Sequence, residues 1–186
     1  KAHMGFVFQN FGLLPLLTAA ENVALSLRIK ELGTRERRQR VREVLDWVGL
    51  SRRSHHRPAE LSGGEQQRVI IASVLAQQAK LLLLDEPTSA LDLKHQQGIY
   101  RILKILAEKE GKTIIIVTHD INLAAQFCNR FILMDKGKII ADGSPSQVLQ
   151  FQLIQQVYGV KVCIDVNPLT KSLYILPYDT KDNGLI

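Results

Sequence analysis

The sequence is poor in the features that mark disulfide-rich, membrane-spanning and disordered proteins. Its 186 residues include two cysteines, Cys128 and Cys163, whose spacing fits neither a disulfide framework nor a zinc site and suits a reducing cytosol. The longest largely apolar runs, at residues 69–76, 81–84 and 114–117, are far shorter than the roughly 20 residues that a membrane-spanning helix needs. The start shows no secretory signal pattern. The remaining composition, with 46% apolar and 23% charged residues, is that of one globular domain.

A phosphate loop of the GxxxxGK type is also missing from these residues. The nearest match is Gly111-Lys112-Thr113, but Leu106 stands at the position of the first glycine. The segment also leads from a predicted helix into a predicted strand, which is the reverse of a phosphate loop. Residues 106–113 are therefore not expected to hold a nucleotide phosphate.

The sequence has more basic than acidic residues, and one segment accounts for the excess. The 24 lysines and arginines exceed the 18 acids by six, and residues 28–57 alone hold ten basic against four acidic residues. A nucleic-acid footprint is one interpretation. We favour a solvated helix face near acidic lipid or a partner, because arginines and apolar residues share one helical pattern. The arginines are Arg35, Arg37, Arg38, Arg40 and Arg42, and the apolar residues are Val41, Val44, Leu45 and Val48.

The order of the apolar patterns predicts an α/β fold with a mostly parallel sheet. Short runs without polar alternation at residues 81–85 and 114–117 flank a helical segment, which is typical of parallel strands with helices on both faces. Residues 130–134 and 138–141 predict an antiparallel hairpin at the sheet edge. Alternating residues after position 160 predict a second, terminal hairpin.

Capping residues and glycines predict where the helices begin and end. Thr18 and Glu21 match a capping box, and Gly33 is expected to end the helix that they start. The next helix is expected at residues 34–49. A third, at residues 65–78, is apolar nearly all round and is therefore expected to be buried.

The most informative motif is Leu61-Ser62-Gly63-Gly64-Glu65-Gln66-Gln67-Arg68. Ser62 and Glu65 match a second capping box, and two glycines without Cβ atoms let an anion approach the helix start. Exposed backbone N–H groups and the helix dipole make such a start positive. An ordinary capped helix is the alternative, and the complete octapeptide argues against it.

Acidic and imidazole side chains follow the predicted strands. Asp85 and Glu86 end one strand, and His119 ends the next. Gln9 follows the strand that ends near Phe8. Ligands of open α/β sheets bind at the carboxyl ends of the strands, so these groups are expected to converge at one edge. One carboxylate there can hold Mg²⁺ while the next faces the reacting group.

Together these motifs resemble those of the ATP-binding cassette (ABC) ATPases, in the same order and over nearly the whole chain. The resemblance implies a P-loop NTPase-like α/β fold and an ATPase that uses ATP and Mg²⁺. It implies that Gln9 reaches the metal and the attacking water, that Asp85 is the Mg²⁺ ligand, and that Glu86 is the general base. His119 resembles the switch histidine that contacts the γ-phosphate.

The resemblance also implies a head-to-tail dimer of two ABC ATPase subunits. Ser62, Gly63 and Gly64 are then expected to bind the γ-phosphate of a nucleotide held mainly by the other subunit, and Asp92 to lie at the dimer interface. Transmembrane permease subunits and an extracytoplasmic binding protein are the further implied partners, with the chain at the cytoplasmic face of the membrane. No nucleic acid is expected.

The family pattern also implies a division of the chain. Residues 10–60 correspond to the helical subdomain that touches the permease, residues 61–150 to the signature helix and catalytic core, and residues 151–186 to a small carboxy-terminal extension of a single domain. In relatives a phosphate loop and an adenine-stacking aromatic precede the glutamine. We therefore expect the chain to lack its amino-terminal part and to be inactive alone.

The type of ABC ATPase has two candidate answers. Residues 90–96, 118–125 and 143–160 resemble the ATPases of iron-siderophore, haem and cobalamin importers, which is the interpretation favoured by the sequence. Residues 8–15, 18–23 and 60–68 also resemble lipoprotein-releasing and macrolide-type ATPases. A soluble ABC ATPase acting on nucleic acid and a non-catalytic binding module are less favoured, the second because Asp85, Glu86 and His119 are all present.

Overall fold

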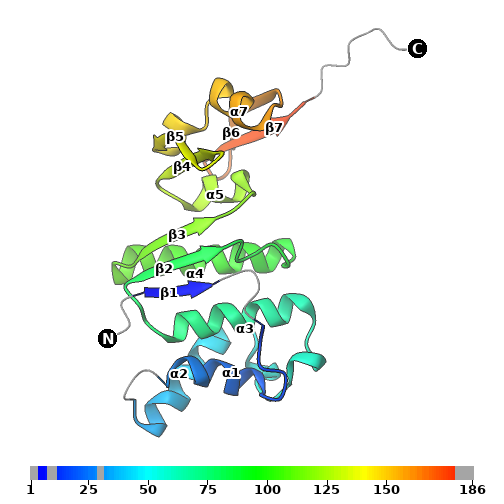
Figure 1. Cartoon of the computed structure of the whole chain (residues 1–186), viewed down its shortest axis with the longest axis vertical. Helices are drawn as coiled ribbons and strands as arrows, with labels where there is room; N and C mark the ends of the chain where they lie inside the picture. Colours follow the sequence, from blue (N-terminus) through cyan, green and yellow to red (C-terminus); the bar gives the residue numbers. More distant parts are fainter. Residues whose placement is uncertain (1–3, 8–11, 29–31, 179–186) are drawn as a thin grey trace, which may run out of the picture. The chain divides into compact units, whose positions relative to one another are not determined.

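The computed structural model describes residues 4–7, 12–28 and 32–178 of the chain. By their internal contacts the residues form two compact units, Lys1–His119 and Asp120–Ile186 (Figure 1). The divisions at residues 60 and 150 that the family resemblance implies stay predictions. None of the helices in the described ranges combines the length and apolar character that crossing a bilayer requires.

Three parallel strands form the sheet of the first unit, as the sequence predicts. They are β1 (Met4–Val7), β2 (Leu81–Asp85) and β3 (Thr113–Val117), and they lie in the order β1-β2-β3. Asp85 at the end of β2 is paired with Val117 at the end of β3. Because parallel strands run in the same direction, their carboxyl ends meet at one edge of the sheet.

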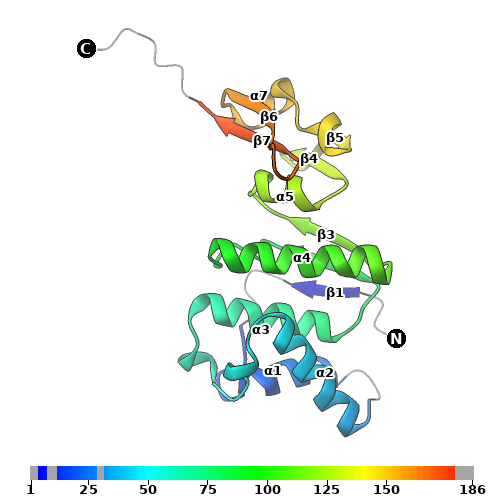
Figure 2. The same ribbon diagram turned by 180° about the vertical axis from the view of Figure 1, so that it is seen from behind.

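One face of this sheet is covered by α4 (Leu93–Glu110), which lies behind the strands in Figure 1 and in front of them in Figure 2. Leu82 and Leu84 of β2 are buried in one core with residues of α4. On β3, Ile115 and Val117 are 48% and 57% exposed and alternate with half-buried neighbours. The sequence predicts helices on both faces of the sheet. In the part of the chain that the structure describes, helices cover one face only.

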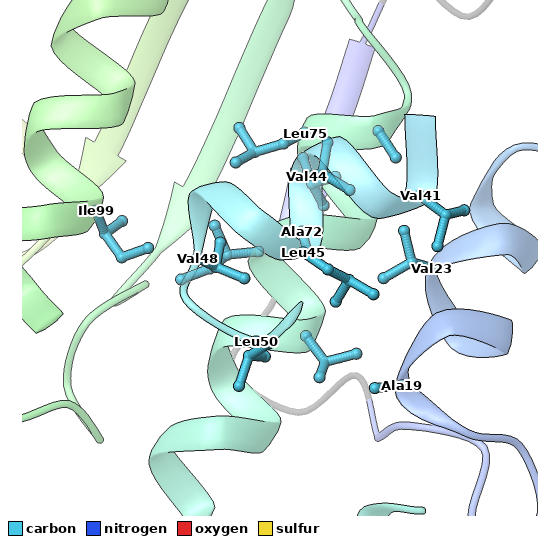
Figure 3. Packing of buried hydrophobic residues seen from close by; sticks show 14 of the residues in the cluster. Ala19, Val23, Val41, Val44, Leu45, Val48, Leu50, Ala72, Leu75 and Ile99 are labelled. Carbon is cyan, nitrogen blue, oxygen red and sulfur yellow. The ribbon is translucent and has the colours of Figure 1, made fainter. Parts of the chain in front are cut away.

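Three more helices of the first unit pack against one another (Figure 3). They are α1 (Ala19–Ser26), α2 (Thr34–Trp47) and α3 (Gly63–Ala76), with short 3-10 turns η1 (Ser51–Arg53) and η2 (Pro58–Glu60) between the last two. As predicted, α3 is largely buried. The three helices share one apolar core with β2 and α4. Its members include Ala19, Val23, Val41, Val44, Leu45, Val48, Leu50, Ala72, Leu75 and Ile99.

The capping box at the start of α1 is confirmed, but the predicted end of this helix is wrong. The Glu21 N–H donates to Thr18 Oγ1 at 3.2 Å, and the Thr18 N–H donates to Glu21 Oε2 at 2.8 Å. The helix ends at Ser26, where the N–H of Leu27 tightens the last turn by bonding the Ala24 carbonyl. Gly33 has an extended backbone and is instead the N-cap of α2.

Arg40 departs from the expectation of a fully solvated arginine face. Its guanidinium donates to the Leu75 carbonyl at 2.9 Å and to Glu43 at 2.8 Å, and it lies 4.8 Å from the centre of the Trp47 ring. Hydrogen bonds and a cation–π contact compensate its burial. Arg40 therefore fastens α2 to α3. The arginines of α2 that are exposed are Arg35, Arg38 and Arg42.

The second unit contains three helices and two hairpins in its described part. Both predicted hairpins are confirmed as antiparallel pairs. The first hairpin forms a two-stranded sheet of its own, whereas the sequence placed it at the edge of the parallel sheet. The elements are α5 (Ile121–Phe127), β4 (Phe131–Asp135), β5 (Lys138–Gly143), α6 (Pro145–Val148), α7 (Phe151–Tyr158), β6 (Val162–Val166) and β7 (Leu173–Pro177).

A side-chain amide joins α5 to the terminal hairpin. Asn122 Oδ1 accepts from the Ile175 N–H at 2.7 Å, and its Nδ2 donates to the Ile175 carbonyl at 3.0 Å. The amide thereby satisfies both backbone groups of one residue of β7. A second apolar core lies in this unit and includes Leu149, Ile154 and Val162.

Candidate functional site at the carboxyl ends of β2 and β3

The start of α3 has the local structure that its sequence predicts. Glu65 N–H donates to Ser62 Oγ at 3.2 Å, and Ser62 N–H donates to Glu65 Oε2 at 2.9 Å, which completes the capping box. Arg53 Nε lies 3.3 Å from the second carboxylate oxygen of Glu65. The hydrogen bond from Ser62, with the charge of Arg53 as a further cause, lowers the pKa of Glu65. This carboxylate partly neutralises the positive helix start.

The two glycines at the start of α3 have different surroundings. A Cβ atom at Gly63 would meet open space, whereas one at Gly64 would lie 3.2 Å from the Ala90 carbonyl oxygen and 3.5 Å from a Leu91 methyl. Position 64 is therefore a close approach between α3 and the turn after β2. The N–H groups of the first helical residues have no acceptor within a helix, so they can serve an anion.

Asp85 and Glu86 lie where β2 ends, as predicted. Glu86 has a φ angle of 43°, in the left-handed region that a residue with a side chain seldom adopts. Its N–H donates to the Val117 carbonyl of β3 at 2.9 Å, and its own carbonyl accepts from the Ser89 hydroxyl at 3.1 Å. These bonds hold the backbone in a conformation that is costly in isolation.

His119 and Glu86 are brought together, as the sequence predicts. His119 Nε2 lies 3.0 Å from Glu86 Oε1, a contact that becomes an ion pair when the imidazole is protonated. The Glu86 side chain is 22% exposed and that of His119 is 81% exposed. The carboxylate is thus held at the sheet edge, whereas the imidazole extends into solvent. This pair is the chemical centre of the candidate site.

Asp92 begins the next element, α4, as its N-cap. Its carboxylate accepts from the His95 N–H at 2.9 Å and contacts His95 Nδ1 at 2.8 Å. The backbone N–H of His95, followed by its imidazole, lowers the pKa of Asp92. Asp92 is well exposed, and its predicted role at a dimer interface stays a prediction.

The donor set at the end of β2 fits a magnesium ion. Asp85 is half-buried, and its carboxylate makes no hydrogen bond or ion pair with another residue of the described ranges. Mg²⁺ is commonly held by one or two carboxylates together with substrate phosphates and water. No group of three metal-binding side chains occurs among the residues that the structure describes, so the other ligands of a magnesium ion would be phosphate, water or residues outside the described ranges. Gln9, the second predicted ligand, lies outside the described residues.

Two glutamines near the site were not singled out from the sequence. Gln67 of α3 donates to the Pro87 carbonyl at 3.2 Å, and Gln96 of α4 donates to the Thr88 carbonyl at 3.1 Å. Both carbonyls belong to the turn that follows Glu86. A signal for Gln67 was present, because it lies three residues after Gly64 and therefore on the same face of α3.

A large groove lies away from these residues. It has a volume of about 850 Å³ and is formed by α1, α2 and the segment after α2, with Ala24, Val41 and Leu45 among its lining residues. Neither Asp85, Glu86 nor His119 lines it. The contact between the Glu86 carboxylate and the His119 imidazole, which could transfer a proton, occurs at the strand ends. The candidate site is therefore placed there and not in this groove.

Comparison with known proteins supports the resemblance seen in the motifs. Residues 1–89 match the family model described as ABC transporter. The chain is 48% identical over 151 residues to the glutamine transport ATP-binding protein GlnQ of Escherichia coli (strain K12), a match that covers 81% of this chain and 62% of GlnQ. Over most of its length the chain is therefore similar to ATP-binding proteins of ABC transporters. A second similar protein is the methionine import ATP-binding protein MetN of Streptococcus pyogenes serotype M4 (strain MGAS10750), 40% identical over 172 residues.

Solved ABC structures share the fold. The cassette MJ0796, in a dimeric post-hydrolysis state bound to ADP and Pi, is 46% identical with a TM-score of 0.72, and the match covers 77% of this chain and 63% of that one. An inward-facing ABC transporter assigned to the metal-chelate type is 23% identical with a TM-score of 0.78, over 96% of this chain and 74% of that one, and shows the fold alone. The chain spans 62% of GlnQ and, with 89% of its own length matched, 49% of MetN.

Proposed function

We propose that this chain belongs to the ATP-binding and ATP-hydrolysing subunit of an ABC importer. The observation that carries the proposal is the contact of 3.0 Å between Glu86 and His119 at the carboxyl ends of β2 and β3. In this proposal the subunit lies at the cytoplasmic face of the membrane. It drives permease subunits that receive cargo from an extracytoplasmic binding protein.

We assign the catalytic roles on the basis of the positions of the side chains. The Glu86 carboxylate, fixed at the sheet edge, accepts the proton of the attacking water. His119 contacts this carboxylate, and its exposed imidazole can turn to donate from Nε2 to a phosphate oxygen. Asp85, with Gln9, would hold Mg²⁺, which when bound neutralises charge on the phosphates.

The nucleotide contacts of α3 are assigned to a second copy of the subunit. The free N–H groups at Gly63 and Gly64 and the Ser62 hydroxyl would bind the γ-phosphate of a nucleotide held mainly by the other copy. Such an arrangement is a two-fold, head-to-tail dimer, in which each site needs residues of both copies. Asp92, at the start of α4, would lie at its interface.

The test of the base is Glu86→Gln, made in a form of the protein that includes a GxxxxGK phosphate loop. We expect ATP turnover to fall by about 100-fold or more, because the amide cannot take a proton. ATP-dependent dimerisation, measured by light scattering, should persist. Glu108→Gln, on the exposed part of α4, is the matched control and should turn over ATP normally.

Two results would contradict this assignment. Normal turnover by the Glu86→Gln protein would exclude Glu86 as the base. We further propose that the 186 residues by themselves, which contain no GxxxxGK motif, do not hydrolyse ATP. Magnesium-dependent ATPase activity in the purified chain would overturn that part.

For the cargo, we propose an amino acid. The names of GlnQ and MetN favour this class over the iron-siderophore, haem and cobalamin class that the sequence motifs favour. The ATPase would be expressed with the permease encoded beside it, and uptake of labelled glutamine, methionine and a ferric siderophore compared. Uptake of an amino acid that is lost in Glu86→Gln is expected. Uptake of the siderophore alone would instead support the iron-siderophore, haem and cobalamin type. Release of lipoprotein or macrolide would support the lipoprotein-releasing or macrolide type.

A further inference from the structure

The turn after Glu86 is held by α3 at two points. Gly64 approaches the Ala90 carbonyl so closely that a Cβ atom would lie 3.2 Å from its oxygen. One helical turn later, Gln67 Nε2 donates to the Pro87 carbonyl at 3.2 Å. Positions 64 and 67 lie on one face of the helix, so this face of α3 contacts both ends of the turn.

The turn itself is stiff, and it begins with Glu86. The Ser89 N–H and hydroxyl both donate to the Glu86 carbonyl, at 3.3 and 3.1 Å. The Leu91 N–H donates to the Thr88 carbonyl at 3.0 Å. Thr88 is buried, and Pro87 has a fixed φ angle. A displacement of the Pro87 carbonyl therefore has to move the adjacent Glu86, whose left-handed backbone depends on its surroundings.

The neighbouring glutamine on α3 shows that this contact is specific to position 67. Gln66 Nε2 donates to the carbonyls of Pro58 and Leu61, at 3.0 and 3.2 Å. Both acceptors lie in the segment that precedes α3. Adjacent amides of one helix therefore bond in different directions, and of these two only Gln67 reaches the turn that carries the candidate base.

We propose that Gln67 is a positioning residue that ties the orientation of the Glu86 carboxylate to the position of α3. Because Gln67 bonds the Pro87 carbonyl, an anion bound at the start of α3 changes the orientation of the Glu86 carboxylate in the same chain. In a dimer, the nucleotide at one site would thereby influence proton transfer at the other. The inference rests on the proposed function, in which Glu86 is the base.

The experiment first uses the 186-residue chain, in which no ATP is needed. The imidazole resonances of His119, assigned with ¹⁵N-labelled histidine and His119→Gln, report the contact with Glu86. Glu86→Ala gives the resonance positions without that contact. Gln67→Met removes the donor at similar size and is expected to move the His119 resonances toward those of Glu86→Ala. Gln66→Met, the matched control, is expected to leave them in place.

The second readout is turnover in a form of the protein with a phosphate loop. Gln67→Met is expected to lower kcat by about tenfold to 100-fold with the KM for ATP unchanged, because a small misplacement of a catalytic group has effects of this size. Gln66→Met should change neither. If Gln67→Met does not fold, Gln67→Glu replaces it, since a carboxylate cannot donate to the Pro87 carbonyl.

The outcomes separate the inference from the proposed function. Unmoved His119 resonances in Gln67→Met, or equal movement in Gln66→Met, would overturn the positioning role even if Glu86→Gln abolishes turnover. An unchanged kcat in Gln67→Met would also overturn it. Moved resonances with normal turnover of Glu86→Gln would instead overturn the base while leaving the mechanical link in place.

Discussion

At the scale of single residues, Glu65 does two things at the start of α3. It closes the capping box with Ser62, and its charge faces Arg53 at 3.3 Å. Glutamine at this position could also close a capping box. The two side chains therefore differ in charge, and the contribution of the glutamate charge to the stability of the fold depends on pH.

The variant Glu65→Gln should show that dependence. Because the folded pKa of Glu65 is lowered, the carboxylate stabilises the fold above its unfolded pKa of about 4.3, and this stability is lost as pH falls through the folded value. We expect the wild type to be more stable by up to about 1 kcal/mol at pH 6, the upper end for a solvent-screened ion pair, and the difference to shrink below pH 4. Urea unfolding from pH 3 to 7 measures it. A constant separation of the two curves would contradict the assignment.

The site residues differed in how far the sequence could predict them. Glu86 and His119 were predicted to meet, because both follow apolar strands and parallel strands end together. The left-handed backbone of Glu86 was not predictable, since glutamate has no preference for it and neighbouring bonds impose it. The bond from Gln67 to Pro87 joins residues 20 apart in the sequence, and such a contact depends on tertiary packing.

At the scale of elements, local signals and long-range placement had different outcomes. The capping boxes at Thr18 and Ser62 are short-range bonds and were found where predicted. The prediction that Gly33 ends the first helix was wrong, because the sequence pattern does not reveal the extended backbone of this residue. The hairpin β4-β5 was predicted from its own residues, whereas its place beside another sheet depends on long-range pairing that periodicity does not encode.

At the scale of the whole molecule, most of the buried apolar residues that the structure describes lie in two clusters, one in each unit. Leu45, 1% exposed, belongs to the cluster of α1, α2 and α3, and Ile154, also 1% exposed, to the cluster of the second unit. Cavities formed in these clusters are expected to loosen different parts of the chain, because lost contacts are felt where the cavity lies.

The paired variants Leu45→Ala and Ile154→Ala test this division. Each should reduce the free energy of unfolding of its own unit by about 2 to 5 kcal/mol. Amide hydrogen exchange is the measurement: Leu45→Ala should accelerate exchange in α1, α2 and α3, and Ile154→Ala in α7, β6 and β7. Equal acceleration in both units by either variant would show that the clusters unfold together.

The open face of β3 has a practical consequence for these experiments. Ile115 and Val117 present branched apolar side chains to water on the last strand of the sheet. Apolar strands at a sheet edge favour association between molecules. We therefore expect this face to promote association of the 186-residue chain, so the histidine spectra have to be recorded at low protein concentration. Dilute samples at low salt, where the net charge of +6 keeps molecules apart, are the appropriate conditions.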